Sequence, residues 1–211
     1  MNDYYKDVIK TADLLDMSEI DLESIKEATI QMLQAFGEDI HREGLQRTPE
    51  RVSQMYIELL AGYRIDPIAM VNDAIFDVEY DEMVLVRDIE FYSLCEHHLL
   101  PIFGRAHVAY IPKGRVVGLS KIPRIVDLYA RRLQLQERMT SQIADFLKNL
   151  LKPQGVGVVL EGLHLCSMMR GVKKHEARMT TSAMRGTFRS SLATRQEFLD
   201  NISRGARSLS L

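Results

Sequence analysis

The sequence predicts an α+β fold in which helices pack against an antiparallel sheet. Two segments rich in Val, Ile and aromatic residues precede a pair of amphipathic helices, and two similar segments follow the pair. Helices grouped between such strands are typical of helices gathered on one face of an antiparallel sheet. No repeat, low-complexity tract or linker interrupts this order. We therefore expect an N-terminal helical arm over residues 1–75, one α+β domain over 76–202 and a C-terminal tail over 203–211.

Two helices are predicted in the arm. Ser18 and Asp21 form a variant capping box before an apolar stripe that runs from Leu22 to Phe36 and stops at Gly37. Thr48 is the expected N-cap of the second helix, with Pro in its first turn, and Gly62 is its expected C-cap. A loop is predicted over residues 63–73.

The domain is predicted to contain four strands and three helices. Strands are expected over residues 83–92 and 105–111, with a turn at 112–114. Helices follow over 120–131 and 134–151, and the second of them stops before Pro153. Further strands are expected over 155–166 and 178–188, with a closing helix over 191–202. Such a sheet has two edges, which favours an oligomer over a monomer because open edges pair with neighbouring chains.

Composition narrows the function class. The formal net charge of −2 gives no basic field for nucleic acid. The N-terminus is polar and acidic rather than signal-like, and no apolar run has membrane-spanning length. We therefore expect a cytoplasmic protein with neither a nucleic-acid partner nor a membrane partner.

Both cysteines of the chain lie next to histidines. Cys95 begins the segment Cys-Glu-His-His, and Cys166 ends the segment His-Leu-Cys. Thiolate and imidazole are zinc ligands, and three of them leave an open position of the kind found in catalytic sites. The Cys-x-x-His spacing selects Cys95 and His98, with Cys166 as the third ligand. A Cys95–Cys166 disulfide or two unrelated thiols are the alternatives, and a reducing cytoplasm favours ligands over a bridge.

Two imidazoles remain beside the predicted metal site. His97 projects away from the metal turn and is free to act as an acid or base. His164 is expected on the same face of an extended strand as Cys166, because side chains alternate along a strand. Histidines that do not bind the metal, placed beside a metal site with an open position, indicate a hydrolytic site rather than a structural metal site.

Six motifs, in this order, resemble those of GTP cyclohydrolase I. The resemblance covers the chain from about Glu19 to the end of the last helix. The motifs are Ser93-x-Cys95-Glu96-His97-His98, Gly118-Leu119-Ser120-Lys121-Ile122-x-Arg124, Gln136-Glu137-Arg138, His164-x-Cys166, Arg170-Gly171-Val172 and Thr180-Thr181-Ser182-Ala183-Met184-Arg185-Gly186.

The resemblance implies a tunnelling-fold subunit in a ring-shaped homo-oligomer, usually a decamer, with active sites between subunits. It implies hydrolysis of GTP to formate and 7,8-dihydroneopterin triphosphate, the first step of folate or tetrahydropterin synthesis. The family's zinc ligands fall on Cys95, His98 and Cys166.

The resemblance also implies catalytic roles. Zinc activates the water that attacks C8 of guanine, and His97 donates a proton to N7. His164 serves ring opening and later acid–base steps, and Ser120 supplies a hydroxyl for the rearrangement and ring closure, unless it is only a helix N-cap. Glu137 anchors the guanine N–H edge, and Gln136 adds backbone contacts.

The triphosphate requires cations, since each good phosphate contact is charge-assisted. Lys121, Arg124 and Arg170 match the family's phosphate-binding positions, and Arg51 is a weaker match on the arm. The chain has no Gly-rich P-loop. Glu96 is assigned either to support of the metal loop or to a structural role.

Two other functions fit parts of the sequence. Another pterin or deazapurine enzyme of the same fold is disfavoured by the pairing of Cys-Glu-His-His with His-x-Cys. A non-catalytic zinc-bearing ring protein is disfavoured by the presence of both His97 and His164, because a structural zinc site needs neither.

Overall fold

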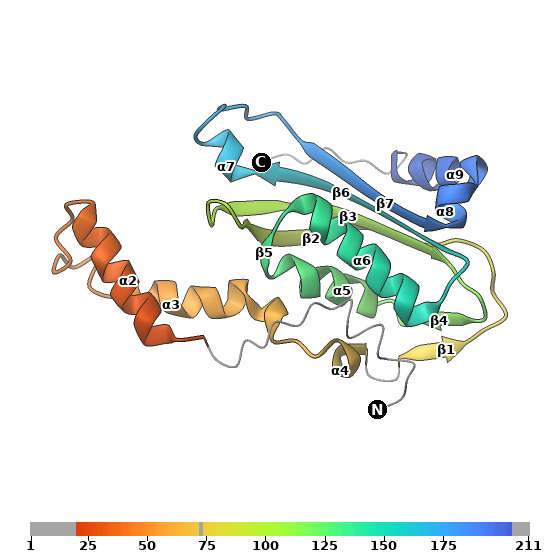
Figure 1. Ribbon diagram of the computed structural model, residues 1–211, viewed down its shortest axis with the longest axis horizontal. Helices are drawn as coiled ribbons and strands as arrows, with labels where there is room; N and C mark the ends of the chain where they lie inside the picture. Colours follow the sequence, from red (N-terminus) through yellow and green to blue (C-terminus); the bar gives the residue numbers. More distant parts are fainter. Residues whose placement is uncertain (1–19, 72–73, 204–211) are drawn as a thin grey trace.

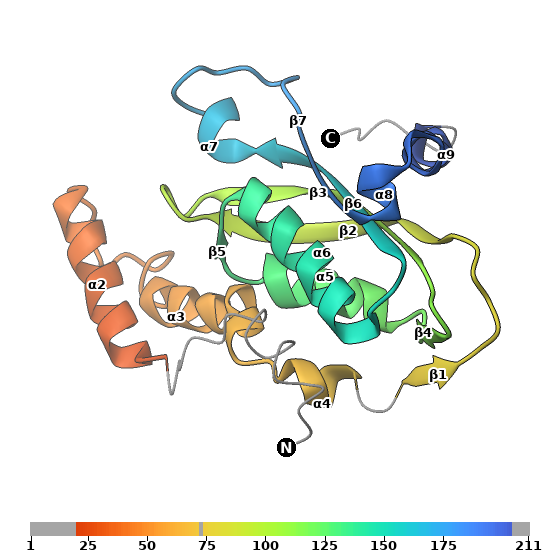
Figure 2. The same ribbon diagram turned by 45° about the vertical axis from the view of Figure 1, so that its right-hand side comes forward.

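The computed structural model describes residues 20–71 and 74–203 (Figure 1). Ser18 of the predicted capping box lies outside these ranges, as does almost all of the predicted C-terminal tail. Within them an arm of helices projects from a body in which helices pack on a twisted sheet (Figures 1 and 2). The predicted α+β class is confirmed.

The arm consists of α2 (Leu22–Ala35), α3 (Thr48–Leu59), the 3₁₀ turn η2 (Ala61–Tyr63) and α4 (Pro67–Val71). Asp21 caps α2 by accepting a 3.0 Å hydrogen bond from the backbone N–H of Ser24. The prediction of Thr48 as an N-cap is wrong by one residue, since Arg47 holds that position and makes no side-chain cap bond. Helix α4 lies where a loop was predicted.

Five strands form the main sheet in the order β5-β2-β3-β6-β7. The four long strands were predicted and pair antiparallel, whereas the two-residue strand β5 pairs parallel with the end of β2. Their bounds are β2 (Val84–Cys95), β3 (Pro101–Ile111), β5 (Leu133–Gln134), β6 (Gly155–His164) and β7 (Met179–Gly186). A second sheet pairs β1 (Ile75–Asp77) with β4 (Arg115–Val117). Segments this short have no periodicity to reveal them.

Helices cover both faces of the main sheet, which corrects the prediction of one covered face. Helices α5 (Lys121–Ala130) and α6 (Gln136–Leu151) lie over one face (Figure 1) and bury the larger core. Helices α8 (Thr187–Ser190) and α9 (Leu192–Ser203) pack on the other face, where Phe188 and Phe198 form part of a smaller buried cluster. Strand β6 has apolar side chains on both of its faces, so both faces must be covered. Its neighbouring residues Val158 and Val159 point to opposite faces of the sheet, and both are buried.

The strand before the second cysteine is shorter than predicted. Strand β6 ends at His164, and Leu165–Met168 forms the helical turn α7. The expectation that His164 and Cys166 share one face of a strand is therefore wrong, because alternation does not extend into a helical turn. His164 is the last residue of β6, and Cys166 lies within the helical turn α7.

Strand pairing at the centre of the sheet depends on glycine. A Cβ atom at Gly104 would lie 1.8 Å from the carbonyl oxygen of Glu161, which precedes Gly162, the β6 residue that pairs with Gly104. Only glycine permits this approach of the two backbones.

Candidate metal centre and active site

A tight hairpin loop presents the first two metal-ligand candidates. Strand β2 ends at Cys95, whose N–H donates to the carbonyl of Leu100 at 2.9 Å, and β3 begins directly afterwards. Leu99 closes the loop in the left-handed region with φ of 55°. The N–H groups of His98 and Leu99 both donate to the Cys95 carbonyl. The loop is therefore held by its backbone, with the Cys95 side chain buried and the two histidine side chains exposed.

Cys95, His98 and Cys166 come together as predicted. One donor atom from each residue forms a group in which all atoms lie within 4.8 Å of one another. His98 Nδ1 is 3.8 Å from the Cys95 sulfur. Neither cysteine is in a disulfide. Two sulfurs and one imidazole nitrogen at these separations fit a soft divalent metal, with one position left open.

His97 lies closer to the thiols than its sequence position suggested. Its Nδ1 atom is 4.0 Å from the Cys95 sulfur, and its ring meets that of His98 edge to face with centroids 6.2 Å apart. His98, rather than His97, completes the group of metal-ligand atoms. His97 remains available for proton transfer beside the metal position.

Burial governs the protonation of two further groups. Burial raises the pKa of the Cys166 thiol, and the neighbouring Cys95 raises it further, so a metal must displace the proton from this sulfur. Burial lowers the pKa of His164, although the carboxylate of Glu137 acts in the opposite direction. His164 is thus a neutral imidazole at pH 7 and is able to accept a proton.

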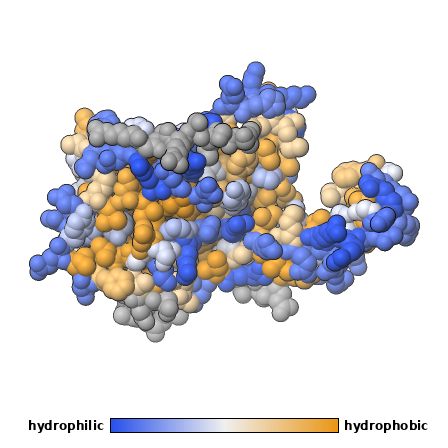
Figure 3. All heavy atoms as spheres, turned by 180° about the vertical axis from the view of Figure 1, so that it is seen from behind, coloured by the Kyte–Doolittle hydropathy of each residue, from blue (hydrophilic) through white to orange (hydrophobic). Residues whose placement is uncertain are grey.

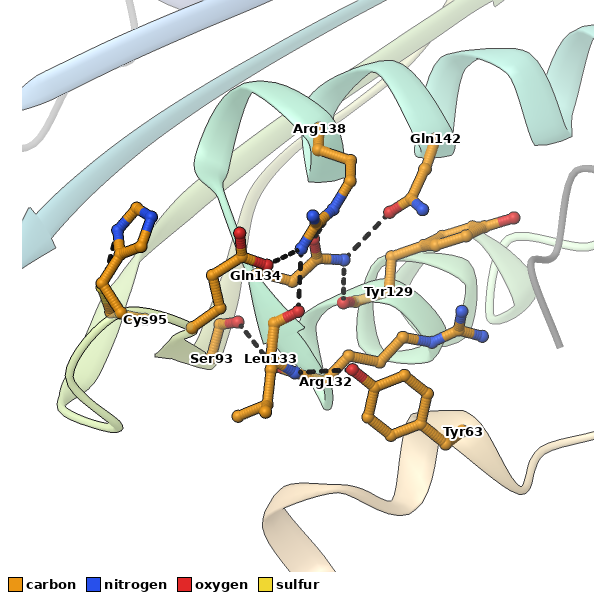
Figure 4. Close-up of polar contacts among 11 residues, drawn as sticks. Tyr63, Ser93, Cys95, Tyr129, Arg132, Leu133, Gln134, Arg138 and Gln142 are labelled. Carbon is orange, nitrogen blue, oxygen red and sulfur yellow. Dashed lines mark hydrogen bonds and ion pairs between the residues drawn. The ribbon is translucent and has the colours of Figure 1, made fainter. Parts of the chain in front are cut away.

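An ion pair joins the metal loop to the start of α6. Arg138 contacts the carboxylate of Glu96, the residue that follows Cys95 and precedes His98 in the metal loop. Its guanidinium also donates to Leu133 O at 3.0 Å and to Gln134 Oε1 at 3.1 Å (Figure 4). No role was predicted for Arg138, although it belongs to the motif Gln136-Glu137-Arg138. The structure places Glu96 in support of the loop.

A hollow of about 320 Å³ lies beside this ion pair. Its polar lining groups bond with one another, as between Gln134 and Gln142 at 2.9 Å (Figure 4). The lining residues are Tyr63, Glu96, Arg132, Leu133, Gln134, Arg138 and Gln142. None of the three metal-ligand candidates is among them, so this hollow is separate from the metal position.

Comparison with known proteins identifies the family. The family model described as GTP cyclohydrolase I matches residues 25–203. The GTP cyclohydrolase 1 of Chlorobaculum tepidum is 56% identical over 87% of this chain and 82% of its own length. That of Deinococcus radiodurans is 55% identical over 85% of this chain and 83% of its own, and that of Campylobacter curvus is 56% identical over 85% and 95%.

The chain belongs to the GTP cyclohydrolase I family.

Within one chain, the motifs quoted for GTP cyclohydrolase I fall into two separate places. The N–H of Val117 donates to Tyr110 Oη, and Tyr110 pairs with Val84 at the far end of β2 from Cys95. Helix α5 therefore starts at that far end, and its ten residues rise about 15 Å before the chain reaches β5 beside Cys95. The motif that carries Ser120, Lys121 and Arg124 does not meet the metal position of its own chain.

The predicted phosphate-binding and guanine-binding side chains differ in exposure. Ser120, Arg124, Glu137, Arg170 and Arg51 are all exposed, and Ser120 occupies the N-cap position of α5 without making a side-chain cap bond. Lys121 is buried and donates from Nζ to the carbonyl of Met70 at 2.8 Å.

Gln136 has a side-chain partner in His164 that was not predicted from the sequence. The side chain is buried, and its Oε1 atom lies 2.9 Å from Nε2 of His164.

Across residues 20–71 and 74–203, no helix is long and apolar enough to cross a membrane.

Proposed function

We propose that this protein hydrolyses GTP to formate and 7,8-dihydroneopterin triphosphate, at the start of folate or tetrahydropterin synthesis in the cytoplasm. One observation carries the proposal: Cys95, His98 and Cys166 form an open three-donor group with His97 beside it, in a chain of the GTP cyclohydrolase I family. A purely structural site gains nothing from an open position or from a neighbouring imidazole.

Zinc is the metal proposed for this group. Two sulfur ligands and one imidazole suit zinc among the common divalent ions. Bound there, zinc activates water as a nucleophile at neutral pH by lowering its pKa to about 7. The tight backbone of the Cys95–Leu100 loop and the Glu96–Arg138 ion pair hold the ligands before the metal arrives.

The chain's own groups bind the base and move protons. Glu137, exposed at the first turn of α6, accepts hydrogen bonds from the N–H edge of guanine. His97 gives a proton to N7 as C8 is attacked, and neutral His164 takes and returns protons during ring opening and the later steps. Ser120 supplies its hydroxyl for rearrangement and ring closure.

A complete site requires a second subunit. Arg170 follows α7 near the metal, whereas Lys121 and Arg124 lie at the other end of the sheet, so the triphosphate of one site is held in part by the neighbouring chain. Arg51 of the arm is a further, weaker candidate contact. Lys121 must exchange its bond to Met70 O for a phosphate oxygen in this arrangement.

The surface supports a ring, for which we propose the decamer usual in this family. Among residues 20–71 and 74–203, no strand pairs with the outer edge of β7, and none pairs with the outer edge of β2 except β5 at its last two residues. Opposite open edges allow head-to-tail contacts that close on themselves. Figure 3 shows a broad apolar area on the face that is hidden in Figure 1, and Tyr92 of β2 is 51% exposed.

The test is incubation of the zinc-loaded protein with GTP, following formate and the absorbance of the pterin. We expect equimolar formate and pterin triphosphate from GTP, and little reaction with ATP, because adenine lacks the N–H donors that Glu137 requires. Zinc binding without turnover of GTP would instead favour the non-catalytic ring protein.

A further inference from the structure

Gln136 makes a set of side-chain bonds that fixes which way its amide faces. Its Nε2 atom donates toward Leu160 O at 3.2 Å, Met179 O at 2.9 Å and Thr181 Oγ1 at 3.1 Å. Backbone carbonyl oxygens only accept hydrogen bonds, so the nitrogen of the amide must be on this side. The amide oxygen is then the atom that lies 2.9 Å from Nε2 of His164. Because an amide oxygen only accepts, Nε2 of His164 carries the proton.

A directed chain of hydroxyl groups reinforces this orientation. Thr140 Oγ1 donates its single proton to the backbone carbonyl of Gln136 at 2.6 Å. The 2.6 Å contact between Thr140 and Thr181 must therefore be donated by Thr181. Thr181 then has lone pairs left for the amide N–H of Gln136. Every proton in this closed loop is committed, and reversing the amide would leave an oxygen facing two carbonyl oxygens in a buried site.

The surrounding backbone leaves the amide no alternative position. Gln136 is 1% exposed, and a Cβ atom on Gly162 would lie 2.3 Å from its Oε1. Gly162 is also the β6 partner of Met179 in β7. The glycine gives the amide its place between the strand and the helix, and strand β7 supplies two of its acceptors.

We propose that Gln136 is a positioning residue whose amide oxygen holds the proton of His164 on Nε2, so that Nδ1 is the ring nitrogen that exchanges protons in the reaction. This inference rests on the proposed acid–base role of His164. It replaces the expected backbone contact to guanine as the main reason for a glutamine at this position. It also gives Thr181, in the β7 motif, a function in the site.

The tautomer is measurable without turnover. The zinc-loaded protein is labelled with ¹⁵N at histidine Nδ1 and studied by solid-state NMR above pH 8, with the His164 signal assigned by its loss in His164→Gln. We expect unprotonated Nδ1 in the wild type, and a mixture of tautomers in Gln136→Met, which fills similar space without an acceptor. A protonated Nδ1 in the wild type overturns the proposal, even if no variant folds. An unchanged tautomer in folded Gln136→Met also overturns it.

Kinetics separate positioning from simple stability. Gln136→Met should lower kcat by about 10–100-fold, the range for outer groups that orient a histidine, with KM for GTP and zinc content nearly unchanged. In a His164→Ala background the same change should have no further effect. Equal losses in both backgrounds would contradict a role through His164.

A matched control is Gln134→Met. Gln134 is also 1% exposed and fully bonded, but its partners include Tyr129 O, Gln142 and Arg138 rather than His164. Its replacement should lower stability, leave the His164 tautomer unchanged and have the same kinetic effect with or without His164. If the wild type made no formate from GTP, the proposed function would fail while the tautomer result still stood.

Discussion

At the scale of single residues, the metal centre depends most on Cys166. Its pKa is raised by burial, and it lies outside the loop that holds the other two ligands. Cys166→Ser should lose most of the zinc together with activity, because a neutral hydroxyl is a poor zinc ligand. Metal analysis of the purified protein measures this. Ser167→Ala on the same turn should keep one zinc per chain, and a fully active, zinc-free Cys166→Ser would refute the ligand assignment.

The two spare histidines are separable from the ligands. General acid–base groups contribute about 10²–10⁴-fold to rate, so His97→Ala and His164→Ala should each lose that much turnover while keeping zinc. They should stall at different points: little should happen at C8 without His97, whereas a ring-opened formamide should accumulate without His164. Chromatography of quenched reactions distinguishes these outcomes. Loss of zinc in both variants would contradict separate catalytic roles.

Glu137 is the residue predicted to select guanine as the nucleobase of the substrate. Glu137→Ala should raise KM for GTP about tenfold or more, since a hydrogen bond to a charged group contributes roughly 1.5–3 kcal/mol. Steady-state kinetics with GTP measures the effect. Glu197→Ala, another exposed carboxylate on a helix, is the control and should have wild-type kinetics. Unchanged kinetics in Glu137→Ala would mean that this face of α6 is only solvated.

At the scale of elements, a bulge in the sheet introduces sensitivity to pH. The register of β2 and β3 shifts between Val86 and Ile89, where Asp88 takes φ of 59° and donates its N–H to Nδ1 of His107 at 3.3 Å. Burial lowers the pKa of His107 below its ordinary 6.5. Asp88 and Glu161 oppose this shift, whereas Arg105 and Arg87 add to it.

The sign of the effect follows from proton binding. Between the lowered pKa of folded His107 and 6.5, the unfolded chain binds more protons, so stability falls as pH falls through this window. Denaturant unfolding at pH 7.5 and at pH 5 should show a loss that is smaller in His107→Gln, whose amide oxygen can still accept from Asp88. An equal loss in the two proteins would exclude His107 as the cause.

At the scale of the whole molecule, the proposed division of the site between neighbouring subunits predicts that inactive variants complement one another. Arg124→Ala and His164→Ala should each be nearly inactive alone. Co-assembled rings should regain activity, because some sites then combine an intact His164 with an intact Arg124 from the neighbouring chain. Unfolding the two variants together and refolding them provides the mixture, and light scattering measures the ring size. Mixtures no more active than their parents would show that the site lies within one chain.

Much of the fold and the site was predictable from local pattern. Helical stripes such as Leu22–Phe36 and long apolar strands such as 155–164 have periods that report their conformation directly. The metal-ligand candidates were predictable because each of the two cysteines, Cys95 and Cys166, has a histidine two positions away in the chain. Their approach to within 4.8 Å agrees with that prediction. The division of the chain at residue 75 stays a prediction.

Only the tertiary structure decided what depends on partners distant in the chain. The bond of Gln136 to His164 joins residues 28 positions apart, and the ion pair of Glu96 with Arg138 joins residues 42 positions apart. Strand β5 has too few residues to show a period. The helical turn at Cys166 likewise has no period of its own. The sequence by itself determined the residue types that bind a metal and move protons. Packing determined which ring nitrogen carries a proton and which motifs lie apart, because burial and hydrogen-bond direction exist only once the chain has folded.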